Sequence, residues 1–260
     1  MNITRLIEVQ GKPLGGGTLP IIITPLVGKT AEAILEEVAA IVPKKPDLLE
    51  WRIDFFAAIG EAKAVVDTAL AIRKASGGIP VLLTRRNVTE GGNAIPIDEA
   101  AVVAMYTAAC QAQCVEVIDY ELSNAPADLK HLRVVSAANG IAMIMSYHNF
   151  QMTPDAATLD SKFVAAERLG ADVAKVAVMP KTEQDVLTLL AATDTARQKV
   201  GVPLISMSMG GVGSLSRIMG WVYGSAATFA VGKSSSAPGQ IAIEDLRTAL
   251  AIVRKAVTGQ

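Results

Sequence analysis

Short apolar segments of β-strand length recur along the chain, and amphipathic segments separate them. The predicted strands span residues 20–27, 47–54, 80–86, 114–121, 140–148, 172–179, 203–209 and 226–232. Between them, apolar residues recur at the i, i+3, i+4 and i+7 positions of helices that pack one face on a sheet. Parallel strands need such long crossovers and are buried on both faces, which makes them almost uniformly apolar. This alternation indicates a parallel sheet covered by helices.

Eight strand and helix units in a chain of 260 residues favour a closed (β/α)8 barrel, the TIM barrel of the α/β class. An open, doubly wound sheet is the alternative. Residues 1–17 are predicted to form a β-hairpin, with Gly11 in or near its turn, that closes the bottom of the barrel. No linker or low-complexity segment divides the chain, so we expect one domain over residues 1–260.

Composition and charge exclude several classes of protein. The chain is 51% hydrophobic, which excludes a disordered protein, and its net charge of −1 argues against a nucleic-acid partner. Because it has neither a signal-peptide core nor about eighteen uninterrupted apolar residues, we expect a cytoplasmic protein with no membrane partner. The two cysteines, Cys110 and Cys114, are predicted to be reduced packing residues, since two thiols without a histidine make a poor zinc site. A small-molecule partner remains.

Polar side chains follow the predicted strands at the points where the strands end. In a (β/α)8 barrel, these carboxyl ends and the loops after them form the active site. The polar residues at these points are Thr24, Glu50, Arg52, Arg86, Glu90, Asp119, Glu121, Ser146, His148, Lys175 and Arg217, followed by residues 234–240. We therefore expect them to gather at one rim of the barrel.

Glu50 and Arg52 lie two residues apart on a predicted strand, so their side chains share one face. If this face is the barrel interior, the two residues form a buried pair that compensates its own charges. Such a pair could clamp a hydroxylated or anionic ligand, or it could be a structural ion pair near the barrel mouth. The residues alone leave both interpretations open.

Lys175 interrupts the apolar segment at residues 171–180. Burial disfavours an ammonium ion relative to a neutral amine, and nearby cations such as Arg52 or Arg86 act in the same direction. A neutral amine can attack a carbonyl carbon and form a Schiff base. The alternatives are a lysine that reaches outward to solvent and one that is neutralised by Glu50.

His148 stands where the fifth predicted strand opens into its loop. A carboxylate that fixes the tautomer of an imidazole makes it a competent general base, and Glu90 is a candidate for that carboxylate. A histidine with a purely structural role is the alternative. The other histidine, His131, lies in a polar helical segment and is expected to be solvated.

Several stretches, taken together, resemble the type I 3-dehydroquinate dehydratases of the shikimate pathway over nearly the full length of the chain. They are LLEWRIDFF, TEGGNAI, IMSYHNF, AKVAVMP, LISMSM, GSAATFA and SAPGQI. The resemblance implies a (β/α)8 barrel, usually a homodimer, that works without a metal or an organic cofactor. It also implies 3-dehydroquinate as the substrate.

Roles for individual residues follow from this resemblance. Lys175 would form an imine with the C3 ketone of the substrate. His148 would remove a C2 proton and then protonate the departing hydroxyl, with syn loss of water, while Glu90 holds the imidazole in place. Hydrolysis of the imine would release 3-dehydroshikimate.

The resemblance also implies which side chains bind the substrate. Arg217 would hold the carboxylate, and Ser236 and Gln240 would belong to a lid. The full set of expected substrate-binding residues is Thr24, Glu50, Arg52, Arg86, Met207, Arg217, Ser236 and Gln240.

Two features depart from the family pattern. Arg85 stands where an uncharged residue is usual, and strand parity points it away from Arg86. The loop at residues 210–213 is unusually rich in glycine, which bears on how Arg217 is positioned.

Two rival functions share the predicted barrel. A Schiff-base aldolase for sugar phosphates would use the same lysine but would need a phosphate site near residues 210–214. A catalytically silent binding barrel would lack Lys175 or His148, and the chain has both.

Overall fold

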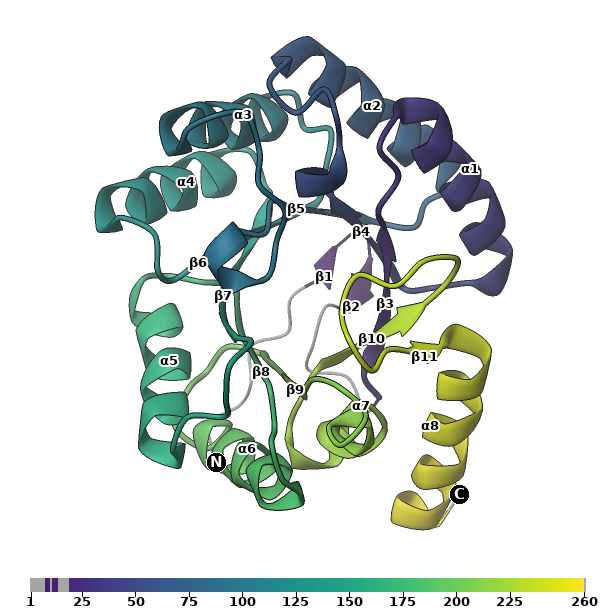
Figure 1. The fold of residues 1–260 in the computed structure, drawn as a ribbon, viewed down its shortest axis with the longest axis vertical. Helices are drawn as coiled ribbons and strands as arrows, with labels where there is room; N and C mark the ends of the chain where they lie inside the picture. The colour runs from purple at the N-terminus through teal and green to yellow at the C-terminus, as the bar shows by residue number, and fades with distance from the viewer. Residues whose placement is uncertain (1–7, 10, 14–18, 260) are drawn as a thin grey trace.

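The computed structural model of the chain describes residues 8, 9, 11–13 and 19–259. Eight parallel strands form a ring in which neighbours along the chain are neighbours in space (Figure 1). They are β3 (Ile21–Leu26), β4 (Leu48–Arg52), β5 (Val81–Thr84), β6 (Val117–Glu121), β7 (Ala142–Asn149), β8 (Val173–Val178), β9 (Leu204–Ser208) and β10 (Ala227–Val231). The predicted strand positions are confirmed.

The ring closes at two places. Between its first and last strands, β3 pairs in parallel with β10. Between β9 and β10, Leu204 forms a parallel bridge with Ser225, and the N–H of Ala226 donates to the Leu204 carbonyl at 2.6 Å. The closed barrel is therefore confirmed, and the open doubly wound sheet was the wrong alternative. A short strand, β11 (Ile241–Ala242), pairs in parallel with the last two residues of β10 at the rim.

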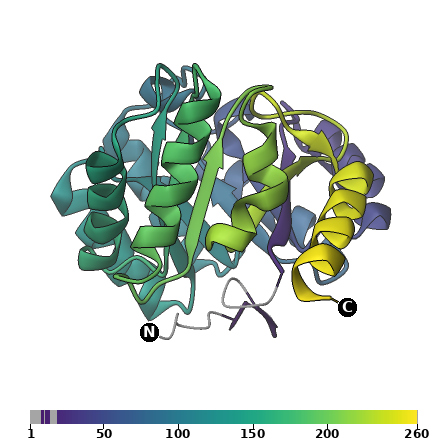
Figure 2. The ribbon, with the colours of Figure 1, turned by 90° about the horizontal axis from the view of Figure 1, so that it is seen from below.

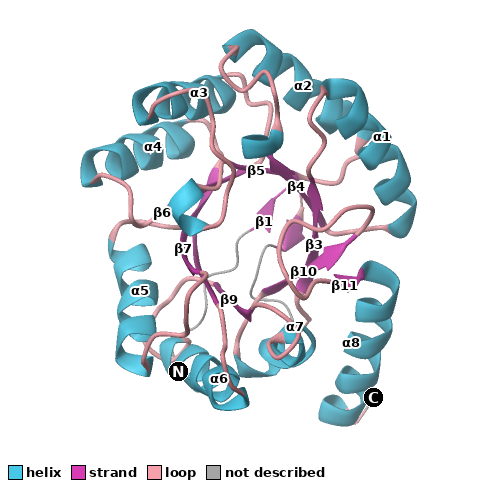
Figure 3. Cartoon of the chain, in the orientation of Figure 1, coloured by secondary structure: helices cyan, strands magenta, loops and turns pink. Residues whose placement is uncertain are grey.

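Helices cover the outside of the ring (Figure 3). They are α1 (Ala31–Ile41), α2 (Ala62–Ala75), α3 (Glu99–Gln111), α4 (Pro126–Ala138), α5 (Ala156–Arg168), α6 (Glu183–Ala196), α7 (Ser214–Met219) and α8 (Ile243–Thr258), with 3-10 turns η1 (Val42–Lys44), η2 (Ile53–Phe55), η3 (Val88–Glu90) and η4 (Gly220–Tyr223). Polar N-caps start several of them; Thr182 and Asp185 form a complete capping box at α6. The helices other than α7 bury apolar residues against the strands, whereas the residues that α7 buries are Ser216 and Arg217.

Strand alternation divides the buried residues into two layers. On β4, Leu48 packs inside the barrel, whereas Leu49 and Trp51 pack outside it against the helices. The same alternation turns Ile144 inward and Met145 outward on β7. The alternation therefore decides which polar side chains at the strand ends can face the barrel mouth.

The N-terminal hairpin lies at the end of the barrel where the strands begin (Figure 2). Strand β1 (Glu8–Val9) pairs antiparallel with β2 (Lys12–Pro13), and Gly11 occupies the turn with φ +71°. Val9 packs against the interior core of the barrel. The predicted turn and bottom closure are confirmed for these residues; the rest of the predicted segment, residues 1–7, 10 and 14–17, lies outside the described residues.

Cys110 and Cys114 are buried free thiols, as predicted. Burial raises the pKa of Cys110 to about 12 and that of Cys114 to about 11, so both stay protonated and unreactive at neutral pH. Within the described ranges, no helix is both long and apolar enough to span a bilayer.

Candidate active site

A small cavity of about 40 Å³ lies at the carboxyl ends of the barrel strands. Of the eleven site residues predicted above, nine line it: Glu50, Arg52, Arg86, Glu90, His148, Lys175, Met207, Ser236 and Gln240. They come from six strands or the loops after them, so the fold brings together residues up to about 190 positions apart. The predicted gathering at one rim is observed.

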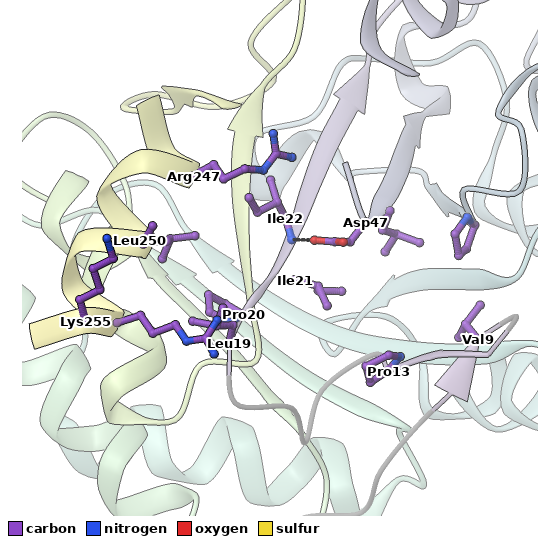
Figure 4. Close-up of a pocket in the computed structure, with 14 residues that line it drawn as sticks. Val9, Pro13, Leu19, Pro20, Ile21, Ile22, Asp47, Arg247, Leu250 and Lys255 are labelled. Atoms are coloured by element: carbon purple, nitrogen blue, oxygen red, sulfur yellow. Dashed lines mark hydrogen bonds between the residues drawn. The ribbon is translucent and has the colours of Figure 1, made fainter. Parts of the chain in front are cut away.

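A larger cavity, of about 780 Å³, lies at the opposite end of the barrel (Figure 4). Its walls are mostly apolar, with Ile21 and Leu250 among them, and its acidic residue Asp47 is already used by the N–H of Ile22 at 2.8 Å. None of its described lining residues is a histidine, and its one lysine, Lys255, is exposed. Size therefore does not locate the candidate site, whereas converging charged groups do.

Lys175 is only 4% exposed and is paired with a carboxylate. Its Nζ donates to Asp119 Oδ2 at 2.7 Å, lies 3.9 Å from Glu50 Oε1 and sits 4.8 Å above the centre of the Phe229 ring. The main partner is thus Asp119, which the sequence analysis placed at the rim but to which it gave no catalytic or binding role. A buried ammonium needs a close counter-ion. Asp119, an inward-facing acid on an apolar strand, was the available signal.

Asp119 also binds a second cation. Arg86 Nη2 lies 2.9 Å from Asp119 Oδ2, and Ser146 donates its hydroxyl to Asp119 Oδ1 at 2.5 Å. Burial alone would raise the pKa of Asp119, but Arg86 and Lys175 hold it far below its usual range. Arg86 is further bound to Glu121 at 2.8 Å. The charge of Arg86 is therefore fully compensated.

His148 and Glu90 form a close pair. Glu90 Oε2 lies 3.0 Å from His148 Nδ1 and accepts from the His148 backbone N–H at 2.8 Å, while Ser123 donates its hydroxyl to Glu90 Oε1 at 2.6 Å. Burial, followed by the charges of Arg86 and Lys175, lowers the pKa of His148 well below its usual value. Burial raises the pKa of Glu90. With Nδ1–H donated to Glu90, the unprotonated nitrogen is Nε2.

Two glycines allow Glu90 to reach the imidazole. Gly91 has φ +85°, and a Cβ there would lie 2.3 Å from the ring of Phe150. A Cβ on Gly92 would lie 1.9 Å from the carbonyl oxygen of Arg86. Only glycine fits such close backbone approaches. The TEGG stretch therefore has a structural reason: it folds η3 back over the end of β5.

Glu50 and Arg52 share the interior face as predicted, but the predicted pairing between them is wrong. Arg52 makes a two-pronged contact with Asp54, at 2.8 Å from Nε and 2.9 Å from Nη2. Glu50 accepts from the Thr84 hydroxyl at 3.0 Å. The turn η2 carries Asp54 back to Arg52, and no strand periodicity predicts that turn.

Arg217, on α7, is a buried guanidinium that contacts no carboxylate in the described part of the chain. Its Nη2 donates to the Pro238 carbonyl at 2.9 Å, its Nη1 lies 3.8 Å from Met207 Sδ, and its Nε has no hydrogen-bond partner. Burial lowers the pKa of Arg217 to about 10. A desolvated cation with a spare donor favours binding of an anion.

Thr24 does not face the cavity, so its expected substrate contact is corrected. Its neighbour Ile23 points inward, and Thr24 points to the outer layer, where a Cβ on Gly232 would lie 2.6 Å from Thr24 Cγ2. Arg85 also points outward and forms an ion pair with Glu99 of α3, as strand parity predicted.

Ser236 and Gln240 belong to one loop, residues 232–240, that covers the cavity. Gln240 Oε1 accepts from the Ser236 backbone N–H at 3.1 Å, and Arg52 Nη1 donates to the Ser236 carbonyl at 3.3 Å. The N–H of Gly210 donates to the Pro238 carbonyl at 3.1 Å. The covering loop therefore packs on the glycine-rich loop after β9, and the backbone N–H of Gly210 is already hydrogen-bonded to it.

No group of three or more His, Cys, Asp or Glu side chains among the described residues could hold a metal ion. The cavity is instead lined by the amine of Lys175, the imidazole of His148 and the carboxylates of Glu50 and Glu90. Such a set can form an imine and move protons beside it.

Comparison with known proteins gives consistent matches over almost the whole chain. The model of the family described as type I 3-dehydroquinase matches residues 22–256. The 3-dehydroquinate dehydratase of Albidiferax ferrireducens is 52% identical over 257 residues, covering 99% of this chain and 97% of that protein. The crystal structure of 3-dehydroquinate dehydratase from Geobacillus kaustophilus superposes with a TM-score of 0.95 at 45% identity, over 98% of this chain and 99% of that one.

A second solved structure is the type I 3-dehydroquinate dehydratase of Clostridium difficile with covalently modified comenic acid. It gives a TM-score of 0.93 at 34% identity and covers 97% of this chain and 99% of that chain. These matches span almost the whole chain in both directions, and the chain belongs to the type I 3-dehydroquinase family.

Proposed function

We propose that this chain dehydrates 3-dehydroquinate to 3-dehydroshikimate through a Schiff base on Lys175. The observation that carries the proposal is the buried Lys175 amine, which lines the same cavity as the His148–Glu90 pair. The family membership supports the same reaction, because the curated relatives carry the name of this activity.

Substrate binding needs both the arginines and a movement of the loop. A cavity of about 40 Å³ has room for only a few water molecules and is smaller than a six-membered ring, which favours a movement of the loop at residues 232–240 on binding. We expect the loop to open, admit the ring and close again, which keeps water from the imine. Arg217 would take the carboxylate, and Glu50, Arg52 and Arg86 the hydroxyls.

Imine formation starts at Lys175. The ammonium, which Asp119 contacts at 2.7 Å as a counter-ion, must first lose a proton to water that enters with the substrate, because the pKa of Asp119 is too low for it to act as the base. The amine nitrogen then bonds to C3 of the ketone, and the carbonyl oxygen leaves as water with one proton from that nitrogen and one returned by the acceptor of the ammonium proton. The resulting iminium withdraws electrons from C2 and makes its protons more acidic.

His148 then acts twice. Its Nε2 takes a C2 proton, and the electron pair of the broken C–H bond passes into the iminium to give an enamine. The enamine expels the C1 hydroxyl, which leaves as water with a proton from the imidazolium. Because His148 both takes the C2 proton and protonates the departing C1 hydroxyl, the proton and the hydroxyl must leave from the same face of the ring. Hydrolysis of the conjugated imine returns the free lysine.

Two measurements test this function. Dehydration creates a conjugated enone, so its ultraviolet absorbance should rise when the protein meets 3-dehydroquinate; no rise would overturn the function. Borohydride added during turnover should fix the substrate to the peptide that contains Lys175. Absence of that adduct from an active protein would overturn the Schiff base alone.

The sugar-phosphate aldolase has less support. It needs a phosphate site in the glycine-rich turn, but the Gly210 amide already donates to Pro238, and a Cβ on Gly213 would lie 2.4 Å from the Met209 carbonyl oxygen. This turn is packed against the covering loop and the end of β9.

The homodimer stays a prediction, which sedimentation would test.

Replacement of Arg217 by alanine is expected to raise KM on the order of 100-fold, because a charged hydrogen-bonded pair with the substrate carboxylate is lost. Arg217→Lys should recover only part of the affinity, since an ammonium cannot bind a carboxylate with two parallel N–H groups. Arg197→Ala, which removes an exposed arginine on the outside of the barrel, is the matched control. An unchanged KM in Arg217→Ala would move the carboxylate site elsewhere.

The pH dependence of kcat/KM is expected to have an acid limb below the ordinary histidine pKa of about 6.5. His148 must be neutral to act as a base, and burial with neighbouring Arg86 and Lys175 lowers its pKa, so the neutral form persists to lower pH. Activity should therefore be flat from pH 7 down through about 6.5 and fall only beneath it. A profile that already falls above this pH would contradict the assignment.

A further inference from the structure

Asp54 is a buried carboxylate to which the proposed reaction assigns no role. Its side chain is 0% exposed, and it accepts hydrogen bonds from three separate parts of the site. These are the guanidinium of Arg52, the backbone N–H of Arg86 at 3.4 Å, and both the backbone and side-chain nitrogens of Asn93 at 3.1 Å. Asp54 does not line the cavity itself. It can therefore act only through the residues that it holds.

The first connection runs through Arg52. Asp54 takes the Nε and Nη2 donors of this side chain, and the ring of Phe55 lies 5.3 Å from its guanidinium carbon. Only Nη1 is then turned toward the covering loop, where it donates to the Ser236 carbonyl. A flexible arginine is thereby held in one rotamer, so that binding does not have to order it.

The second connection runs through the loop after β5. Asn93 follows Glu90 by three residues, and its two bonds to Asp54 fasten that loop to the end of β4. Glu90 in turn holds His148 through two bonds. Asp54 thus holds two parts of the site: the side chain of Arg52, and the loop that carries Glu90, the carboxylate that orients His148.

We propose that Asp54 is a positioning residue that sets Arg52 for substrate binding and the Glu90 loop for proton transfer. The inference rests on the proposed function. It predicts two separable effects, because the Arg52 connection influences binding, whereas the Asn93 connection influences the orientation of His148.

The main test is Asp54→Asn in the full-length protein. The new amide would point N–H donors at the N–H donors of Arg52, so one half of the two-pronged contact becomes repulsive. We expect KM to rise at least tenfold and kcat to fall about tenfold. The matched control is Asp172→Asn: Asp172 likewise accepts from an arginine, Arg133, and from a backbone N–H, that of Met143, but at the start of the strands.

A double-mutant cycle separates positioning from mere stability. In an Arg52→Ala background, Asp54→Asn should no longer raise KM, because the side chain through which it acts is gone. The fall in kcat should persist in that background. If Asp54→Asn raises KM by the same factor with and without Arg52, the Arg52 connection is wrong.

Asn93→Ala tests the second connection and avoids any question of folding, since Asn93 is exposed. We expect kcat to fall about threefold and KM to stay unchanged. If Asp54→Asn does not fold, Arg52→Lys replaces it: lysine keeps the charge but cannot form the two-pronged contact, so KM should rise about tenfold. Wild-type constants in both Asn93→Ala and Arg52→Lys would overturn the proposal.

The two levels of proposal fail in different ways. If the wild-type protein forms no enone from 3-dehydroquinate, the proposed function is wrong. If the wild-type protein is active and Asp54→Asn matches Asp172→Asn in KM and kcat, only the role of Asp54 is wrong.

Discussion

Replacement of Lys175 by methionine is expected to lower kcat on the order of 10,000-fold or more and to abolish trapping of the substrate by borohydride. Methionine is unbranched and apolar and fills a similar volume, so the barrel interior should stay packed. Asp119 loses one of its two cations but keeps Arg86 at 2.9 Å, so its charge is not left without a partner. Loss of activity would then report lost chemistry.

Lys162→Met is the matched control for this variant. Lys162 lies on α5 outside the site, where its Nζ sits 4.6 Å above the ring of Tyr147. Both variants should be compared by turnover and by intact mass after borohydride treatment with 3-dehydroquinate. Substantial turnover by Lys175→Met, or a specific adduct on another lysine, would show that Lys175 is not the nucleophile.

Replacement of His148 by alanine is expected to separate imine formation from removal of the C2 proton, two steps that Lys175→Met abolishes together. The imine forms before the C2 proton is taken, so borohydride should still trap the substrate on Lys175. Turnover should fall about 100-fold to 10,000-fold, which is the usual contribution of a general acid or base. The expected result is an adduct without product.

The chain contains one other histidine, which makes the control simple. His131 Nε2 lies 3.1 Å from the Thr107 hydroxyl on the outer helices, so His131→Ala should leave turnover unchanged. Near-normal rates in His148→Ala would mean that another group is the base. Loss of both the adduct and turnover would instead place His148 in imine formation.

The strand positions could be predicted because parallel strands in a barrel are buried on both faces and become short apolar segments between helices. Where a strand also carried charged residues, the period of two predicted their direction correctly. Glu50 and Arg52 face inward together, and Arg85 faces the helices. The inward direction of Lys175 was one of the alternatives that the sequence left open, because its strand is otherwise apolar at every position.

Thr24 shows where this reasoning fails. Residues 20–27 are apolar at nearly every position, so no alternation distinguishes the two faces of β3. Thr24 was placed by its position late in the strand, and the register of β3 between β10 and β4 turned it outward. A uniformly apolar strand carries no information about its own parity.

The partners of the buried charged residues could not be predicted from the sequence, for a different reason. Lys175 pairs with Asp119, 56 residues away, and Arg52 pairs with Asp54, which follows a sharp turn. Several acids stood at the strand ends, and each was an acceptable partner for a buried cation. Distances of a few ångströms decide among them, because Coulomb energy in a poorly solvated interior depends steeply on separation.

The sequence by itself determined the barrel, the end of the barrel that carries the chemistry and the residue types found there, because these depend on local periodicity and composition. Only the tertiary structure decided that Arg217 is a buried cation without a carboxylate partner among residues 8, 9, 11–13 and 19–259, that Asp119 neutralises Lys175, and that Asp54 holds Arg52. Those facts depend on which side chains from distant strands come within hydrogen-bonding distance, and closing the ring sets that distance.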